Sequence, residues 1–192
     1  MNMNSTQNVE DYFSTHEEVS RRIDFSQIQF AANLIYNKIL DGKNIFTMGN
    51  GGSAHNASHY ITDWNKMANT STGLKVKGTC LNDNMGLVTA FSNDLSFEEI
   101  FSGQLKILMN NEDLVIVVSG SGNSRNIIKA LEYANENNAT TLAFLGFDGG
   151  ESIKIAQHHI LVPSFDMQIC EDIHLKIGHM IMKFLCKYEI RK

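Results

Sequence analysis

The stretch LVIVVSGSGNSRNIIKALEYA, residues 114–134, decides the fold class. It begins with five consecutive apolar residues, Leu114 to Val118, as expected of a strand that is buried on both faces of a sheet. A serine- and glycine-rich run follows at once, and the helical pattern after it predicts a helix over Ile127–Asn135. A buried strand, a tight turn and a helix in this order form the unit from which parallel α/β sheets are built.

The same unit recurs along the chain. Further strands are expected at Asn44–Gly49, Thr141–Gly146 and His159–Val162. The first of these leads into a helix that runs to about Lys66, and the last precedes a helix over about Gln168–Tyr188. Alternating strands and helices predict a parallel sheet with helices on both faces.

Residues 8–42 are different, because their apolar spacing predicts two helices and no strand, with Gly42 as the stop of the second. We therefore predict a single domain over residues 1–192, with residues 1–42 as an N-terminal helical extension. The fold class is α/β, a three-layer sandwich around a parallel, flavodoxin-like sheet.

Composition excludes several classes of function. The net charge of −5 argues against a sequence-independent nucleic-acid binder, which needs a basic face. It leaves room for a small anionic ligand, since backbone amides can hold a phosphate on an acidic protein. No run approaches the roughly 20 apolar residues of a membrane span, and the N-terminus lacks the pattern of a signal peptide. The three cysteines show no CxxC spacing, which favours reduced thiols. We expect a cytoplasmic protein without nucleic-acid or membrane partners.

Two loops have the chemistry of a phosphate site, because ligands of parallel sheets bind at the carboxyl ends of strands. The first loop, residues 49–53, has three glycines that let backbone approach a ligand, and the second loop, residues 119–124, has three hydroxyls before a helix. The alternative is that these residues only end strands and cap helices. Neither loop matches a dinucleotide or triphosphate motif, so no nucleotide cofactor is expected. The predicted substrate-binding residues in the loops are Asn50, Gly51, Gly52, Ser53, Ser119, Gly120, Ser121 and Ser124.

Acid–base and metal candidates lie on two of the helices. His59 and Asp63 are four residues apart on one helical face, and Glu171 shares a face of the last helix with His179, or alternatively with His174. Two histidines and two carboxylates can hold zinc or a similar divalent ion, or can move protons without a metal. Each residue taken alone is more often an ordinary surface group, and a His–Asp pair at this spacing also stabilises helices.

Five strings occur in the order found in the phosphoheptose isomerases of the SIS (sugar isomerase) family, and the chain resembles that family over nearly its whole length. They are GNGGSAHNASHYITDW, SNDLSFEEIF, VSGSGNSRNIIKALEYA, LGFDGG and EDIHLKIGH. The resemblance implies the SIS fold and the interconversion of sedoheptulose 7-phosphate with a D-glycero-D-manno-heptose 7-phosphate. The product would feed bacterial lipopolysaccharide, capsule or surface-layer glycans. Homotetramers with active sites at subunit interfaces are also implied.

The resemblance assigns roles to individual residues. Those implied to hold the sugar phosphate are Ser53, Ser119, Ser121 and Ser124, and Asp94 is implied to contact the sugar. The residues implied to surround the reacting carbons and to bind one zinc ion per site are His59, Asp63, Glu171 and His179. Of these, we expect His179, Asp63 and Glu171 to be catalytic.

The chain departs from the family pattern at three positions. Asp63 stands where the family has a glutamate, Glu171 where it has a glutamine, and Met67 where it usually has an arginine. Arg125, directly after the second loop, could supply that missing charge. These departures bear on which sugar is bound and on which group acts as the base.

Two other classes of SIS protein provide alternatives. One is a non-catalytic adaptor that binds the replication initiator, and that branch lacks a histidine at the position of His179 and an acid at that of Asp63. The other is a sugar-phosphate-sensing transcription regulator, which carries a DNA-binding domain that this chain has no room for. Within the enzymes, the alternative is an isomerase of another sugar phosphate.

Overall fold

The computed structural model of the chain describes residues 9–187. Its centre is a parallel sheet in the order β2-β1-β3-β4-β5. This is the flavodoxin-like order, as predicted. The strands are β1 (Asn44–Gly49), β2 (Lys77–Cys80), β3 (Leu114–Ser119), β4 (Thr140–Leu145) and β5 (His158–Leu161).

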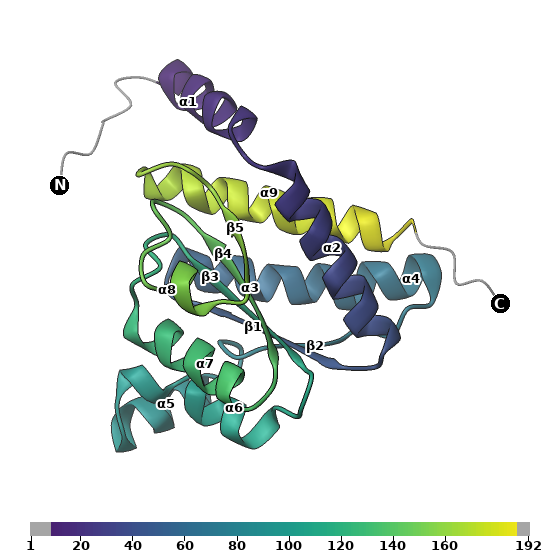
Figure 1. Cartoon of the computed structure of the whole chain (residues 1–192), viewed down its shortest axis with the longest axis vertical. Coiled ribbons are helices and arrows are strands. Elements are labelled where there is room, and N and C mark those ends of the chain that lie inside the picture. Colours follow the sequence, from purple (N-terminus) through teal and green to yellow (C-terminus); the bar gives the residue numbers. More distant parts are fainter. Residues whose placement is uncertain (1–8, 188–192) are drawn as a thin grey trace.

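Helices cover both faces of this sheet (Figure 1). On one face lie α2 (Phe25–Leu40), α3 (Gly52–Asp63) and α9 (Met167–Leu185), with α1 (Val9–Arg21) packed on α9. The other face carries α5 (Met85–Asp94), α6 (Ser102–Leu108), α7 (Arg125–Glu136) and α8 (Ser152–Ile155). Short helical segments at Trp64–Ala68, α4 (Asn69–Thr72) and Phe97–Glu99 complete the described part. The predicted three layers and two N-terminal helices are confirmed.

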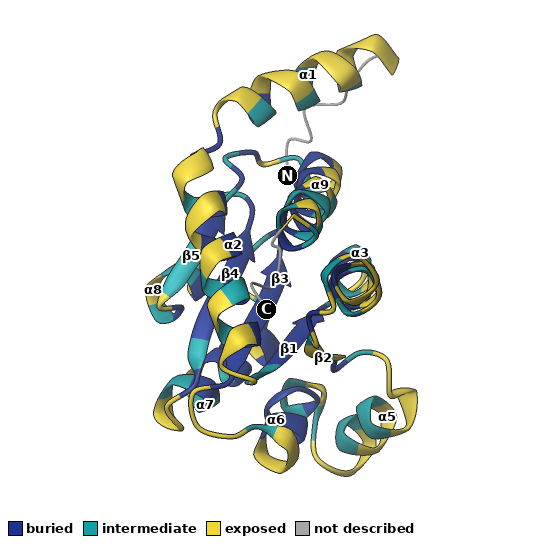
Figure 2. Ribbon diagram, turned by 90° about the vertical axis from the view of Figure 1, so that its right-hand side faces the viewer, coloured by how far each residue is buried: buried dark blue, intermediate teal, exposed yellow. Residues whose placement is uncertain are grey.

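Burial follows the layers (Figure 2). The side chains of β3 alternate, so that Leu114, Ile116 and Val118 pack under α2, α3 and α9, while Val115 and Val117 pack under α6 and α7. This double burial explains the uninterrupted apolar run from which the strand was predicted. No helix among residues 9–187 is both long enough and apolar enough to cross a membrane.

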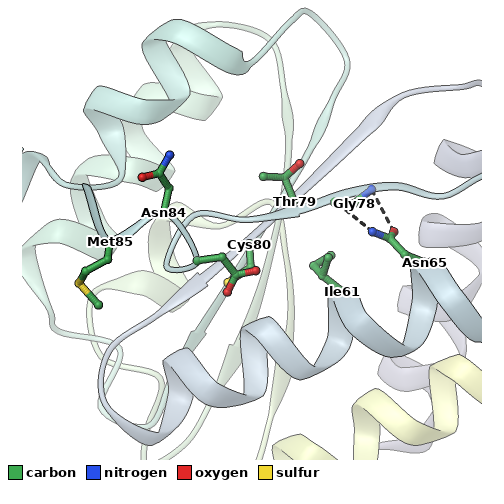
Figure 3. A pocket seen from close by; sticks show the side chains of 8 residues that line it. Ile61, Asn65, Gly78, Thr79, Cys80, Asn84 and Met85 are labelled. Carbon is green, nitrogen blue, oxygen red and sulfur yellow. Dashed lines mark hydrogen bonds between the residues drawn. The ribbon is translucent and has the colours of Figure 1, made fainter. Parts of the chain in front are cut away.

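The edge strand β2 was not predicted from the sequence, and neither were the helices α5, α6 and α8. The strand is short and half-exposed, and its outer side is closed by a side chain, because the amide of Asn65 pairs with the backbone of Gly78 (Figure 3). A hollow of about 560 Å³ lies beside it, between α3 and β2. The lining residues are Ile61, Asn65, Gly78, Thr79, Cys80, Asp83, Asn84 and Met85, so none of the predicted site residues faces this hollow.

Two helix ends differ from the prediction. The α-helix α3 stops at Asp63, and the chain continues to Ala68 as a π-helix, a wider turn that often occurs at functional sites. The last helix ends at Leu185, and Tyr188 lies outside the described residues. Both differences are of the size expected when helix ends are predicted from apolar spacing.

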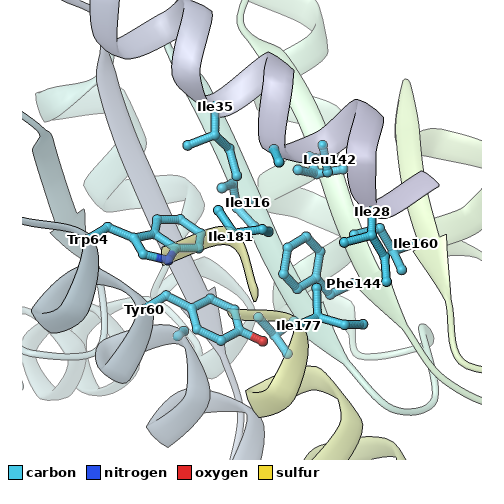
Figure 4. Packing of buried hydrophobic residues seen from close by; sticks show 14 of the residues in the cluster. Ile28, Ile35, Tyr60, Trp64, Ile116, Leu142, Phe144, Ile160, Ile177 and Ile181 are labelled. Atoms are coloured by element: carbon cyan, nitrogen blue, oxygen red, sulfur yellow. The ribbon is translucent and has the colours of Figure 1, made fainter. Parts of the chain in front are cut away.

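Helices α3 and α9 run side by side in the same direction, and this seam carries the predicted acid–base and metal candidates. The Tyr60 hydroxyl donates to the carbonyl oxygen of His174 at 2.6 Å, and the Trp64 indole donates to that of Gly178 at 3.1 Å. Both rings are fully buried and lie in the core between the helices and the sheet (Figure 4). Close approach depends on Gly178, since a Cβ there would overlap the Tyr60 ring. The seam is therefore tight and has one register.

Candidate functional site

The two loops lie side by side at the carboxyl ends of neighbouring central strands. They follow the paired strands β1 and β3, whose register places Gly49 beside Val118. The sheet runs from β1 to β2 on one side and to β3 on the other, so the loops flank the point where strand order reverses. Ligands of open α/β sheets bind at such points. The fold thus brings together the two segments that were predicted to share a phosphate.

The second loop is folded around its own serines. The Ser119 hydroxyl accepts the amide N–H of Gly122 at 3.0 Å, and Gly122 has a φ of +65°, which glycine adopts without strain. A Cβ at Gly122 would also overlap the carbonyl of Gly149, so the next loop packs directly on it. Ser124 is the N-cap of α7, yet its side chain makes no capping hydrogen bond. That hydroxyl is not used as an ordinary helix cap, which favours the ligand role over the capping alternative.

The first loop combines a buried hydroxyl with an engaged amide. Ser53 is 4% exposed in the first turn of α3. The side chain of Asn50 exchanges two hydrogen bonds of 2.9 Å with that of Asn126. The contact of Asn50 with substrate stays a prediction, and because the side chain is engaged, the backbone of Asn50 would have to make it. Gly51, with a φ of +56°, turns the chain into the helix.

Three candidates meet on the exposed side of the α3–α9 seam. The Nε2 atoms of His59 and His179 are 3.1 Å apart. The Oδ2 atom of Asp63 lies 3.3 Å from the first and 3.7 Å from the second. The His59 and His179 side chains are 45% and 42% exposed, so a ligand can reach both rings. In a hydrogen bond between these two nitrogens one donates and the other accepts, and the tautomers of the rings decide which.

The same three residues fit a divalent metal ion. Four tetrahedral ligands at ordinary zinc distances are separated from one another by about 3.3 Å. The three separations in the group lie close to this value, and the donor set of two imidazoles and one carboxylate is one that zinc accepts. The residues present therefore fit the implied metal.

Glu171 lies at the other end of the seam and is not a member of this group. Its carboxylate sits against the Cα of Gly52 and the N–H of Ser53, and its carbonyl oxygen accepts from the side chain of Asn56 at 2.9 Å. Burial raises the pKa of the Glu171 carboxyl, and Asp172 raises it further, against the opposing effects of His55 and the Ser53 amide. Glu171 is thus placed beside the first loop rather than beside His179.

Two other candidates lie away from the group. His174 is 0% exposed in the core, so of the two histidines that were paired with Glu171 only His179 is accessible. Asp94 is exposed at the end of α5, where it accepts a hydrogen bond from the neighbouring Asn93. Helix α5 packs on the opposite face of the sheet from α9. Within one chain, Asp94 is therefore not part of the seam.

Sequence reasoning missed Asn82 and Asn126, whose side chains hold the first loop. The available signal was weak. Asn126 falls in the first turn of a helix at a position that turns out to be 2% exposed, where an apolar residue would be usual.

Comparison with known proteins identifies the family of the chain. The SIS domain family matches residues 11–146. The phosphoheptose isomerase of Thermodesulfovibrio yellowstonii is 34% identical over 165 residues, which cover 85% of this chain and 81% of that protein. The structure of a phosphoheptose isomerase from Neisseria gonorrhoeae superposes with a TM-score of 0.84 at 26% identity, covering 92% of this chain and 96% of that one.

A second structure, of a phosphoheptose isomerase from Francisella tularensis, has the same fold, with a TM-score of 0.86 at 24% identity, covering 97% of this chain and all of the other. The order of the strands, the two loops at the switch point and the matches over most of the sequence lead to one assignment. The chain belongs to the SIS-domain family, among the phosphoheptose isomerases.

Proposed function

We propose that this chain interconverts sedoheptulose 7-phosphate and D-glycero-D-manno-heptose 7-phosphate by an aldose–ketose isomerisation. Its family makes it a sugar-phosphate isomerase. The observation that carries the proposal is the pairing of a two-loop phosphate site with the His59–Asp63–His179 group along a single helix seam. The seven-carbon substrate is the part taken from the names of the relatives.

Binding comes first in the proposed mechanism. Ser53, Ser119, Ser121 and Ser124 would hold the phosphate with their hydroxyls, and the amides of the loops would add donors near two helix N-termini. Anchoring one end of the open-chain sugar places its first two carbons at a set distance along the seam. Positioning of this kind supplies a large share of the rate enhancement of many enzymes.

Proton transfer follows at the seam. Isomerisation moves a proton between the first two carbons through a cis-enediol, so it needs one group that removes the proton and one that returns it. His179, Asp63 and Glu171 are the candidates. The raised pKa of Glu171 brings that carboxyl nearer to a working pH, and the His179 imidazole provides a second group that can donate or accept a proton. Zinc held by His59, Asp63 and His179, when bound, supplies a Lewis acid beside the sugar.

The proposal includes a homotetramer with sites at its interfaces. Helices α1 and α2 expose large apolar side chains, among them Phe13, Phe25 and Phe30, and α1 stands out from the body (Figure 2). Apolar surface of this extent usually marks a contact. A neighbouring chain could then supply Asp94, which its own chain keeps on the other face. Sedimentation velocity is expected to give a four-chain species, and a monomer would remove this part of the proposal.

The adaptor alternative fits less well. That branch lacks counterparts of His179 and Asp63, whereas here these two residues are brought together with His59. The location and pathway in the proposal are the cytoplasm and the supply of heptose for lipopolysaccharide or capsule. Unchanged heptose in the surface glycan of a strain without the chain would argue against that pathway.

The test is a phosphorus NMR assay of the purified, metal-analysed protein with sedoheptulose 7-phosphate. A new heptose 7-phosphate signal is expected, with pentulose and hexulose phosphates converted more slowly. If only a shorter sugar phosphate is converted, the proposed substrate is wrong, whereas the proposed class of reaction stands. No conversion of any sugar phosphate, with and without added zinc, would contradict the enzyme proposal.

A further inference from the structure

The first loop is anchored on the side of β2 by one asparagine. Asn82, two residues beyond β2, donates from Nδ2 to the carbonyl oxygen of Gly49 at 2.9 Å and accepts the Gly49 N–H at 3.2 Å. The amide thus satisfies the N–H and the C=O of Gly49, which a longer parallel β2 would have bonded through two of its backbone residues. The side chain of Asn82 thus continues the sheet for one residue beyond the end of its edge strand and holds the start of the loop.

A second asparagine anchors the same loop on the side of β3. Asn126, in the first turn of α7, donates to Oδ1 of Asn50 and accepts from its Nδ2, both at 2.9 Å. The Oδ1 atom of Asn126 also accepts the N–H of Ile127 at 2.9 Å, and the residue is 2% exposed. A buried amide with its oxygen and nitrogen both engaged has one orientation, so the pair is rigid.

Together the two anchors set the distance between the loops. Asn50 belongs to the first loop, and Asn126 follows the second loop by two residues. Hydroxyls from both loops are proposed to hold one phosphate, so a displacement of one loop against the other would misplace the phosphate or the sugar. A misplacement of about 1 Å far from the reacting atoms can cost about a hundredfold in rate.

We infer that Asn82 and Asn126 are positioning residues for the isomerase reaction, whose side-chain amides hold the first loop in register with the second. The inference rests on the proposed function for its kinetic consequence. Neither residue is assigned a contact with the reacting carbons. Their effect passes through Gly49 and Asn50.

The chain provides a matched control in Asn65. Its amide makes the same pair of hydrogen bonds, at 3.0 and 3.2 Å, with the backbone of Gly78 on β2, away from both loops (Figure 3). Asn65→Ala and Asn82→Ala each remove two amide hydrogen bonds from the backbone of one glycine. The glycine is Gly78 of β2 in the first variant and Gly49 of β1 in the second. Any difference between the two variants in activity therefore reports on the loop rather than on the loss of an amide.

The experiment compares Asn82→Ala, Asn126→Ala and Asn65→Ala by urea unfolding and by steady-state kinetics. All three variants are expected to lose stability, while kcat/KM falls roughly ten- to hundredfold only in Asn82→Ala and Asn126→Ala. If kcat/KM is unchanged in both loop variants, or falls as far in Asn65→Ala, the inference is wrong.

Two further variants test the Asn50–Asn126 pair directly, and the second of them, Asn126→Asp, keeps the test informative if Asn126→Ala does not fold. The double variant Asn50→Ala/Asn126→Ala should lose no more kcat/KM than the more damaging of the two single variants, because each single change already removes the interaction between the two side chains. In Asn126→Asp, the carboxylate can only accept at neutral pH, whereas the protonated acid donates to Asn50 as the amide does. Activity relative to the wild type should therefore recover as the pH is lowered. The pairing would be contradicted if the losses in kcat/KM of the two single variants added in the double variant, and if the activity of Asn126→Asp relative to the wild type did not change with pH.

Binding of inorganic phosphate separates this inference from the proposed function. If the wild type converts no sugar phosphate, the proposed function fails, and the inference is then judged by phosphate affinity in a phosphorus NMR titration. A roughly tenfold weaker affinity in Asn82→Ala and Asn126→Ala, with Asn65→Ala unchanged, would support it, in line with the loss of one aligned set of donors. Equal affinity in all variants would overturn it.

Discussion

Replacing His179 by alanine is expected to lower kcat/KM for the sugar phosphate by about 1,000-fold, within the range that a positioned acid–base group contributes. The Nε2 atom of His179 lies 3.1 Å from that of His59 and 3.7 Å from the Asp63 carboxylate. Its loss removes a proton carrier and leaves two of the three metal ligand candidates. Steady-state kinetics and elemental analysis should therefore both change, with less zinc retained by the variant.

A matched control is His158→Ala. His158 lies on the edge strand β5, where its ring packs on Phe30 at 4.7 Å between centroids, away from the α3–α9 seam. This variant should keep its turnover and its metal. Near-wild-type turnover in both His179→Ala and Glu171→Ala would show that the seam has been assigned the wrong chemistry.

Lowering the pH from about 6.5 to about 4 is expected to cost the fold about 3 kcal/mol through His174 alone. Complete burial lowers the pKa of His174 to about 4, only partly offset by the Leu145 backbone. The unfolded chain binds a proton at this histidine below pH 6.5, whereas the folded chain does so only below about 4. The stability is thus fully present above 6.5 and is lost as the pH falls through this window.

Urea unfolding at a series of pH values, for the wild type and for His174→Leu, measures this contribution. The variant should show a much flatter dependence between pH 6.5 and 4, because leucine takes up no proton. Glu99→Gln is the control. Hydrogen bonds from Lys129 and Ser102 hold the pKa of Glu99 at about 2, so its contribution is lost below 4.5 and not in the upper part of the His174 window. An unchanged slope in His174→Leu would contradict the account of its burial.

Most of the sheet could be predicted because its central strands are buried on both faces and are therefore rich in apolar and β-branched residues. The run is uninterrupted over Leu114–Val118 in β3, whereas Thr47 interrupts it in β1. The helices between the strands require parallel pairing. The strand β2 could not be found in this way. It has four residues, two of which are exposed, and it is held by pairing with β1 and by the side chain of Asn65. Interactions of that kind leave no periodic signal in the sequence.

The site was predictable to a similar degree. The helical spacing of His59 and Asp63 placed these two on one face, and the serine loops stand out by composition. The approach of His179 depends on the α3–α9 seam and on Gly178, which spacing within one helix does not reveal; the family resemblance pointed to it instead. Glu171 was expected in the same group, yet in the structure its carboxylate lies by the first loop. The partners of Asn50 and Gly49 are far apart in sequence, so only the fold identifies them.

The most direct test of the central claim, that this seam moves a proton between adjacent carbons of a ketose phosphate, is isomerisation of sedoheptulose 7-phosphate in heavy water. An enediol formed by general bases open to solvent exchanges its proton over repeated turnovers. The proton NMR spectrum of the aldose product should therefore lose the signal of the hydrogen on its second carbon, because deuterium replaces it. Product that carries no deuterium after many turnovers would mean that hydrogen moves without reaching these groups, and would contradict the account.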